Sequence, residues 1–592
     1  MAFYWRNDQL YAKQAVIPEK KQEESWTTFL LDLREPMGML DMDEFGPFLA
    51  RSLGFTNNLR GVTVYLDHHR LLSIDKNIRE SHPMIIPDAM HKTSPQNLFT
   101  LKSFDLQSLK MRASKWSQEN HAVEEIFLRT ASGNLDVRVP KQFADEMERT
   151  TKKRPPNKTT LQVLYIGHDE TVVSTDNKTI FKDLLPFPEQ GRIFVGFPTH
   201  QTTGFCGHVA GQFIPTVERE SLDFVDKRIE VWNRELLSIA GLLARMIYED
   251  ELAQIGNMYN RSTLSRRTTD EPEDESTARS RERLENRALH ALQAFQLHPS
   301  TPSPLVGSHI DDQFFKMSKS SLSVLSSHGV KELDKVRIPD PNMLAFLKNL
   351  PILPTSIYWG SQTSMDRLEK AGKIQRISLA DVLGELKSRT LTGTQMVALL
   401  RWWMNNNSSF AVSDADIKAF FQTTLVYSGD SALPLSTFKW FINPELTPVD
   451  MPFPPETLPY EITEHFKQPG LNRISAEWKE LSLYEWMTYI VKKPDFEISP
   501  EFSEKILHVL SRGWDRLPEF SQKTIITLLT SKKCIPTKYG MKTPKETYFN
   551  TVTLFSDLPV MVFTEQPLDK LMLALGTRQV RQYLCLHSVP SL

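Results

Sequence analysis

A long apolar stripe that begins near residue 225 limits most strongly what this chain can fold into. Strand-like residues precede it in the segment VAGQFIPT. The apolar residues recur at spacings of three or four, which is the period of a helix with one buried face. They are Val225, Ile229, Trp232, Leu236, Ile239, Leu243 and Ile247. The pattern therefore predicts one long amphipathic helix that packs against a β-sheet.

The composition is that of an ordinary globular protein with several domains. The chain has 592 residues, of which 40% are hydrophobic and 24% charged. With a formal net charge of −2, the chain as a whole has no electrostatic field that would attract nucleic acid or an anionic membrane. No apolar run approaches the roughly 18–20 residues of a membrane span, so no membrane association is expected. Three widely spaced cysteines, Cys206, Cys534 and Cys585, indicate reduced thiols and a cytoplasmic protein, with a nuclear one as the alternative.

The first part of the chain shows strand and helix patterns in turn. Residues 26–33, WTTFLLDL, alternate like a strand with one buried face. Asp41 and Glu44 resemble a capping box that starts a helix, and residues 62–66 and 71–74 follow as a hairpin. Because the chain opens directly on the strand-like run AFYWRNDQLYA, we expect a fragment that begins inside a domain.

A mostly β region is expected to extend to about residue 215. Strand patterns occur at 106–111, 125–129, 135–139, 161–166 and 193–195. The tripeptide Ser132-Gly133-Asn134 is interpreted as a turn that joins the second and third of these strands.

The second half of the chain is expected to be mainly helical. A charged linker precedes it, in which the arginines and acids of residues 260–287 balance. Two later blocks then share one order, two helices followed by a hairpin-like pair. The helices are expected at 383–404 and 413–422 in the first block, and at 500–514 and 520–529 in the second. This order is typical of a winged helix and predicts an internal repeat.

Two side chains are candidates for contact with a nucleotide. Arg219 lies between VAGQFIPT and the long helix, where a permanently charged guanidinium could meet a phosphoryl group. Its neighbours Glu218 and Glu220 favour the alternative of surface ion pairs. Thr27 could place its hydroxyl in a pocket, although β propensity alone explains a threonine in a strand.

The sequence offers no catalytic or metal-binding signature. His200, Cys206 and His208 lie close together, but a structural zinc site needs four ligands and no fourth is evident. A buried cysteine and hydrogen-bonded histidines are therefore favoured, and no metal is expected. The motifs GxxxxGK[ST], GxGxxG after a strand, GxSxG and HExxH do not occur, so no catalytic residue is assigned.

The segment PTHQTTGFCGHVAGQFIPTVERESL, followed by WNRELL, resembles the repeating middle region of the sacsin family. Sacsin in turn resembles the ninety-kilodalton heat-shock chaperones. The segments WTTFLLDLREP, DEFGPFLARSL, LSLYEW and IPTKYGMKTPKETYF extend the resemblance over nearly the whole chain, to a fungal family of large proteins related to the plant protein NO VEIN. That family has an N-terminal ATPase domain of the GHKL class, the histidine-kinase and heat-shock-chaperone type.

The resemblance implies a multidomain α+β protein. Its parts would be the C-terminal part of a GHKL α/β sandwich (1–78), a chaperone-like αβ middle domain (79–258), a charged linker and helix (259–300), and a helical C-terminal region with winged-helix-like units (301–450 and 451–592). Thr27 would match a nucleotide-contacting threonine, and Arg219 an arginine that senses the γ-phosphate. The helix that binds Mg²⁺ and the loop that binds adenine would lie upstream of this sequence.

We therefore expect a non-catalytic fragment of a sacsin-like, ATPase-coupled chaperone or scaffold protein. It would not be an enzyme and would hold no cofactor of its own, because ATP and Mg²⁺ would act only in the intact protein. Its partners would be protein clients or scaffold proteins. The chain could also associate with other chains through an open sheet edge. The alternatives are a nucleic-acid-binding winged-helix protein, which the near-neutral charge disfavours, and a complete ATP-binding protein with a cryptic pocket.

Overall fold

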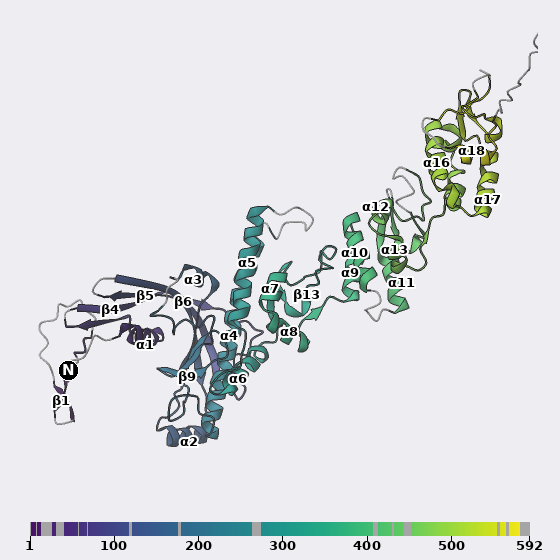
Figure 1. Cartoon of the computed structure of the whole chain (residues 1–592). Helices are drawn as coiled ribbons and strands as arrows, with labels where there is room; N and C mark the ends of the chain where they lie inside the picture. The colour runs from purple at the N-terminus through teal and green to yellow at the C-terminus, as the bar shows by residue number, and fades with distance from the viewer. Residues whose placement is uncertain are drawn as a thin grey trace, which may run out of the picture. The chain divides into compact units, whose positions relative to one another are not determined.

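In the computed structural model the chain divides into two compact units. Figure 1 labels their helices and strands. The first unit comprises Met1–Arg267, Pro272–Leu325 and Trp359–Ser364, and the second comprises Thr268–Glu271, Ser326–Tyr358 and Met365–Leu592. The structure describes residues 2–6, 9–13, 27–30, 41–56, 58–67, 69–117, 121–175, 179–262, 264, 274–406, 413–428, 431–442, 451–552, 557–563 and 568–579. Helices and strands are mixed in both units, as expected for a protein of mixed α and β structure.

A mixed sheet of eight strands lies at the centre of the first unit, in the order β3-β4-β5-β6-β7-β10-β8-β9. All neighbours are antiparallel except β10 and β8. The strands are β3 (Gly61–Leu66), β4 (His69–Met84), β5 (Phe99–Trp116), β6 (His121–Val137), β7 (Lys158–Tyr165), β8 (Arg192–Phe194), β9 (Pro198–Thr202) and β10 (His208–Ala210). A separate hairpin pairs β1 (Ala2–Arg6) with β2 (Gln9–Lys13). Strands β3 and β9 form the edges of the described sheet, and association through such an edge stays a prediction.

The first helix confirms the start signal at Asp41. Helix α1 (Met42–Gly54) begins where the Asp41 carboxylate accepts a hydrogen bond of 2.7 Å from the Asp43 N–H. At its other end the buried Lys76 amine of β4 donates to the carbonyls of Leu53 and Gly54. Burial lowers the pKa of Lys76 to about 8. Helix α1 thus shares a core with β4 to β7, and the expected boundary between residues 78 and 79 falls inside strand β4.

The predicted amphipathic helix is confirmed as α4 (Lys227–Arg261), which starts at an Asp226 cap. Six of the seven apolar residues of the predicted stripe are buried in it. Val225 precedes the cap and is 93% exposed, so its place in the stripe was wrong. The other helices of this unit are α2 (Lys141–Thr151), α3 (His168–Val173), α5 (Glu275–Ala294) and α6 (Pro304–Lys316).

The prediction of a turn at Ser132-Gly133-Asn134 was wrong, because β6 continues through these residues. The reason is the packing of α4 on the sheet. A Cβ at Gly133 would lie 2.9 Å from the Leu101 side chain and 3.2 Å from that of Leu243 in α4. Glycine at this position therefore lets the helix approach the strand closely.

A buried ionic cluster connects β6, α3, α4 and α5. It consists of Arg129, Asp169, Glu170, Glu251 and Arg287. The Glu251 carboxylate is its centre, since it accepts hydrogen bonds from Arg129 and, at 3.0 Å, from Arg287. Arg129 also donates to Glu170 at 2.8 Å, and Arg287 donates to Asp169 at 3.0 Å. Burial alone would lower the pKa of Arg129, but the adjacent Tyr165 and Glu251 raise it above its ordinary value. All five charges are thus fixed by their partners.

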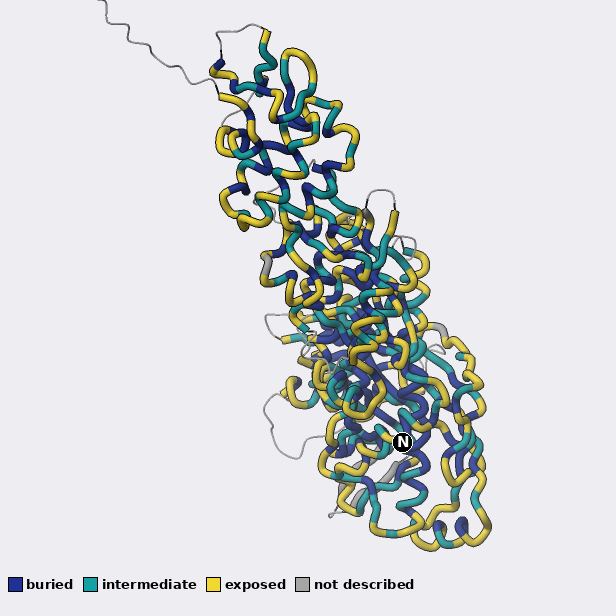
Figure 2. Tube along the Cα trace, turned by 90° about the vertical axis from the view of Figure 1, so that its right-hand side faces the viewer, coloured by how far each residue is buried: buried dark blue, intermediate teal, exposed yellow. Residues whose placement is uncertain are grey.

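The second unit contains two hydrophobic cores, whose buried residues are dark blue in Figure 2. Its helices are α9 (Leu379–Ser388), α10 (Gly393–Asn406), α11 (Asp414–Thr423), α12 (Tyr460–Thr463), α13 (Gln468–Ile474), α14 (Leu483–Ile490), α15 (Asp495–Ile498), α16 (Pro500–Gly513), α17 (Glu519–Thr530) and α18 (Asp569–Leu575). Helices α7 (Thr355–Gly360) and α8 (Gln362–Lys370) precede them. The single helix expected over 383–404 was wrong, because the extended Arg389 ends α9 before α10 begins.

Three short hairpins in this half of the chain are each followed by a one-turn 3-10 helix. They are β11 (Ser323–Ser326) with β12 (Gly329–Glu332), β15 (Leu425–Ser428) with β16 (Ser431–Pro434), and β19 (Ile535–Thr537) with β20 (Gly540–Lys542). The 3-10 helices are η2 (Leu333–Lys335), η3 (Leu435–Thr437) and η5 (Pro544–Glu546). The hairpins expected at the end of the two blocks are thus present, and the described residues contain a third hairpin of the same kind, β11 with β12.

A parallel backbone bridge follows each of these 3-10 helices. Arg337 pairs with Ile352, Trp440 with Thr457, and Tyr548 with Val560. In the first two repeats the same segment, β13 (Arg337–Ile338) or β17 (Trp440–Phe441), also pairs in parallel with β14 (Gln375–Arg376) or β18 (Lys479–Glu480). The same hydrogen-bonding plan therefore recurs at intervals of roughly 100 residues.

Among the helices of the described residues, none has both the length and the apolar content to cross a membrane.

Candidate functional site: the Arg219 turn

The loop between β10 and α4 is held in place by two residues of the helix. Trp232 donates its indole N–H to the carbonyl of Gln212 at 2.8 Å. The fully buried Asn233 accepts from the Ile214 N–H at 2.9 Å and donates to the carbonyls of Ile214 and Asp223. Asn233 thus connects both sides of the loop to α4. Trp232 and Asn233, the WN pair of the segment WNRELL, therefore anchor the loop to α4.

Arg219 lies at the tip of this loop, in a hydrogen-bonded turn. Its N–H donates to the carbonyl of Thr216, and the Thr216 N–H donates to the carbonyl of Ser221, both at 2.9 Å. A backbone bridge between Pro215 and Leu222 closes the turn. Arg219 has a φ of 63°, a left-handed conformation that costs a residue with a side chain about 1–2 kcal/mol. The arginine is therefore held at the tip against its own backbone preference.

The expected ion pairs of Arg219 do not form. In the described part of the chain, no carboxylate lies within ion-pairing distance of its guanidinium, including those of Glu218 and Glu220. The guanidinium carbon lies 5.2 Å from the centre of the Phe197 ring instead. Two exposed apolar side chains flank the turn, with Val217 94% and Val225 93% exposed. We call Val217, Arg219 and Val225 the Arg219 surface.

The segment around Thr27 is exposed. Residues 27–30 have no regular secondary structure, and Phe29 and Leu30 are 76% and 82% exposed. The strand prediction for WTTFLLDL is therefore wrong over these residues, because an alternating pattern becomes a strand only when a neighbour pairs with it. Residues 26 and 31–33 lie outside the described residues. Thr27 itself is exposed, and its contact with a nucleotide stays a prediction.

No group of three or more histidine, cysteine, aspartate or glutamate side chains among the described residues could hold a metal ion. Arg219 and Thr27 are both exposed and supply no enclosed cradle for a triphosphate.

The three residues considered as zinc ligands lie in different environments. Cys206 and His208 are buried, whereas His200 is exposed. Burial raises the pKa of the Cys206 thiol to about 12 and so disfavours the thiolate that zinc requires. His208 accepts a 2.8 Å hydrogen bond from the Arg192 N–H through Nδ1, which fixes its neutral form. The preference for a buried cysteine and a hydrogen-bonded histidine is therefore confirmed for Cys206 and His208.

Acidification is expected to destabilise the first unit through His208. Burial, with the nearby charges of Arg192 and Arg51, lowers the pKa of His208 to about 3. The neutral ring therefore stabilises the fold fully above the unfolded pKa of about 6.5, and this contribution falls as the pH drops toward 3. Between pH 7 and pH 5 the loss should be about 2 kcal/mol. Urea unfolding at both pH values measures it.

The His208→Gln variant should lose this part of the pH dependence, while the exposed His465→Gln should keep it. Equal pH dependence in the wild type and His208→Gln would contradict the assignment.

Comparison with known protein families assigns most of the chain to one family. Residues 115–583 match the profile of a family described as a protein of unknown function, DUF3684. The chain belongs to this family. The DUF3684 match includes the Arg219 turn and most of both units, and it begins after Thr27. No curated protein and no solved structure matches the chain.

Proposed function

We propose that this DUF3684 chain is a non-catalytic part of a sacsin-like, ATPase-coupled chaperone or scaffold protein, and that the Arg219 surface contacts its ATP-binding part. The observation that carries the proposal is an exposed arginine without a carboxylate partner in the described residues, held in a left-handed conformation in a turn that also carries the exposed Val217. Backbone strain of this kind is characteristic of functional positions.

The chemistry of the Arg219 surface suits a protein partner. Arginine is enriched among the residues that dominate protein interfaces, where its planar guanidinium can bind an anionic group. The exposed Val217 and Val225 add apolar area to the same loop. The Trp232 and Asn233 hydrogen bonds hold the loop before a partner arrives, so little conformational entropy is lost on binding.

The winged-helix-like blocks would hold protein clients in this proposal. The test is the binding of reduced, carboxymethylated α-lactalbumin, a permanently unfolded polypeptide, at several salt concentrations. Binding that changes little between about 50 and 200 mM salt supports the chaperone function. Binding of DNA or RNA that falls steeply over that range supports the nucleic-acid alternative instead. Micromolar binding of Mg-ATP in calorimetry would overturn the non-catalytic assignment.

The Arg219→Gly variant is expected to be more stable and to bind less tightly. Glycine adopts a positive φ without strain, so the free energy of unfolding should rise by about 1 kcal/mol. Affinity for the GHKL domain of a longer member of the resembled fungal family should fall at least about tenfold. Urea unfolding and calorimetric titration in the presence of ATP measure the two effects.

Lys152 offers a matched control, since it is also an exposed cation with a left-handed backbone, at φ 60°. Lys152→Gly should gain similar stability and keep full affinity. Unchanged affinity of Arg219→Gly would exclude the Arg219 surface as the contact.

A further inference from the structure

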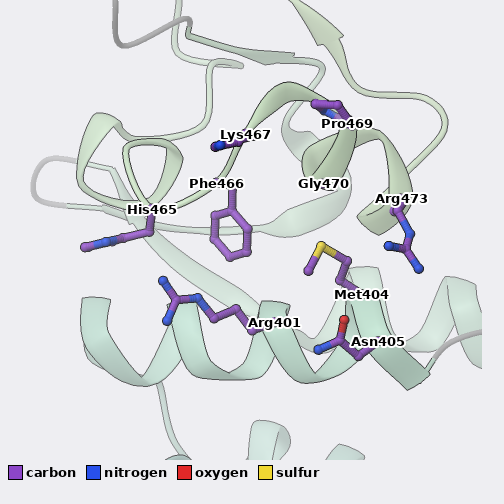
Figure 3. A pocket seen from close by; sticks show the side chains of 9 residues that line it. All are labelled: Arg401, Met404, Asn405, His465, Phe466, Lys467, Pro469, Gly470 and Arg473. Atoms are coloured by element: carbon purple, nitrogen blue, oxygen red, sulfur yellow. The ribbon is translucent and has the colours of Figure 1, made fainter.

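A pocket of about 330 Å³ opens between α10 and α13 in the second unit (Figure 3). One wall is the last part of α10, and the other is the segment that follows α12 and continues into α13. Nine residues line it: Arg401, Met404, Asn405, His465, Phe466, Lys467, Pro469, Gly470 and Arg473. A volume of this size matches the lower end of small-molecule sites.

The lining is positively charged. It contains the cations Arg401, Lys467 and Arg473, as well as His465, but no aspartate or glutamate. Figure 3 shows that Arg401 rises from α10 below His465, whereas Arg473 approaches from α13 at the opposite end. Positive charges from two elements therefore surround one space, in a chain with 70 basic and 72 acidic residues.

Two of these cations, Arg401 and Lys467, lack the carboxylate partners that other cations of the same unit have. Arg389 pairs with Glu385 at 2.6 Å, and Lys439 pairs with Glu456 at 3.0 Å. Arg401 and Lys467 pair with no carboxylate in the described part of the chain, although both are exposed and long enough to do so. The pocket thus keeps positive charge available for an external anion.

The floor of the pocket is apolar. The ring of Phe466 is nearly buried, and the Arg401 guanidinium carbon lies 5.9 Å from its centre. Met404 lies beside it in Figure 3, below Gly470. A Cβ at Gly470 would lie 3.2 Å from the Met404 sulfur, so glycine brings α13 close to α10.

The walls are fixed by the core behind them. Leu471 and Ile474 of α13 are buried in the same core as Trp403, the residue before Met404. Trp403 donates its indole N–H to the carbonyl of Ile474 at 3.4 Å. A pocket whose walls are already packed loses little entropy when it binds a ligand.

We propose that this pocket binds a small phosphate monoester. The phosphate would lie among Arg401, Lys467 and Arg473, and an apolar part of the ligand would contact Phe466 and Met404. A guanidinium group can donate two parallel hydrogen bonds to the oxygens of a phosphate, and the two positive charges of Arg401 and Lys467 match the charge of a phosphate dianion. The cations gather around one open hollow between α10 and α13, which favours a small molecule over an extended nucleic acid, whose binding surface would follow a backbone. This inference does not depend on the proposed function.

Phenyl phosphate is a suitable probe because it combines a dianionic phosphate with a flat apolar ring. Calorimetric titration of the full chain should show saturable binding with a Kd below about 1 mM. Inorganic phosphate should bind less tightly, and phenol should not bind measurably. The Arg401→Gln/Arg473→Gln variant should raise the Kd for phenyl phosphate at least tenfold.

Arg516→Gln is the matched control, because Arg516 is an exposed arginine of the same unit outside the pocket. Its Kd should equal that of the wild type, and circular dichroism should show that all variants fold. The proposal is overturned if phenyl phosphate does not saturate the wild type, or if the double variant binds it equally well. Tighter binding of a single-stranded RNA that the double variant loses, without phenyl phosphate binding, would replace the proposed ligand by nucleic acid.

Discussion

Replacing Glu251 with alanine is expected to destabilise the first unit by about 3–5 kcal/mol. The Glu251 carboxylate is 4% exposed and pairs with both Arg129 and Arg287. Its removal takes away the anion that the two buried guanidinium groups share and leaves each with one carboxylate, Glu170 for Arg129 and Asp169 for Arg287. The loss of a buried countercharge is among the most costly defects in a protein interior. Urea unfolding measures the change.

Hydrogen exchange should localise the effect of Glu251→Ala to peptides from β6, α4 and α5, where the cluster residues lie. Glu275→Ala is the control, since Glu275 pairs with Arg279 on the exposed side of α5 and should contribute about 0.5 kcal/mol or less. A loss below about 1 kcal/mol for Glu251→Ala would show that the cluster does not depend on this carboxylate.

Trp403→Ala is expected to destabilise the second unit by a similar amount, about 3–5 kcal/mol. The Trp403 side chain is 2% exposed and stacks on Phe420 with ring centres 3.9 Å apart and planes 5° from parallel. Alanine would leave a large cavity between α10 and α11 and would also remove the hydrogen bond to Ile474. Thermal unfolding followed by circular dichroism measures the loss.

The control for Trp403→Ala is Phe520→Ala, which removes an aromatic ring that is 78% exposed in the same unit. That substitution should change stability by about 0.5 kcal/mol or less. If the two variants were equally stable, the core around Trp403 would have to close the cavity by repacking.

The elements that sequence predicted well are those whose pattern is local. The α4 stripe has a helical period, and Asp41 carries its own start signal, so neither needs knowledge of a distant partner. Gly133 was misinterpreted as part of a turn because its role depends on Leu101 and Leu243, which come from other elements. The strand expected around Thr27 was wrong over residues 27–30 for the complementary reason, since an alternating pattern becomes a strand only when a neighbouring strand pairs with it.

The candidate site was predicted only in part. The position of Arg219 before the long helix could be inferred from sequence, but its left-handed backbone and its contact with Phe197 could not. The basic pocket could not be predicted because Arg401 and Lys467 are distant in sequence and meet only through the packing of α10 and α13. Neither residue belongs to a recognisable motif.

The repeat was recognised in two blocks and missed in its full extent. Its shared feature is a backbone bridge at Arg337, Trp440 and Tyr548, three residues with unlike side chains. Hydrogen bonds between main-chain groups impose little demand on side-chain identity. The hairpins and 3-10 helices of the three repeats are therefore more alike in structure than in sequence.

This main-chain plan affects how the protein can change length during evolution. The two strands of each bridge lie between one 3-10 helix and the next. A segment copied or lost between these points therefore includes both strands, and the remaining repeats keep their bridges. Gain or loss of such a cassette would leave no orphaned amide or carbonyl at the junction. Relatives are therefore expected to differ by whole cassettes of roughly 100 residues more readily than by fractions of one.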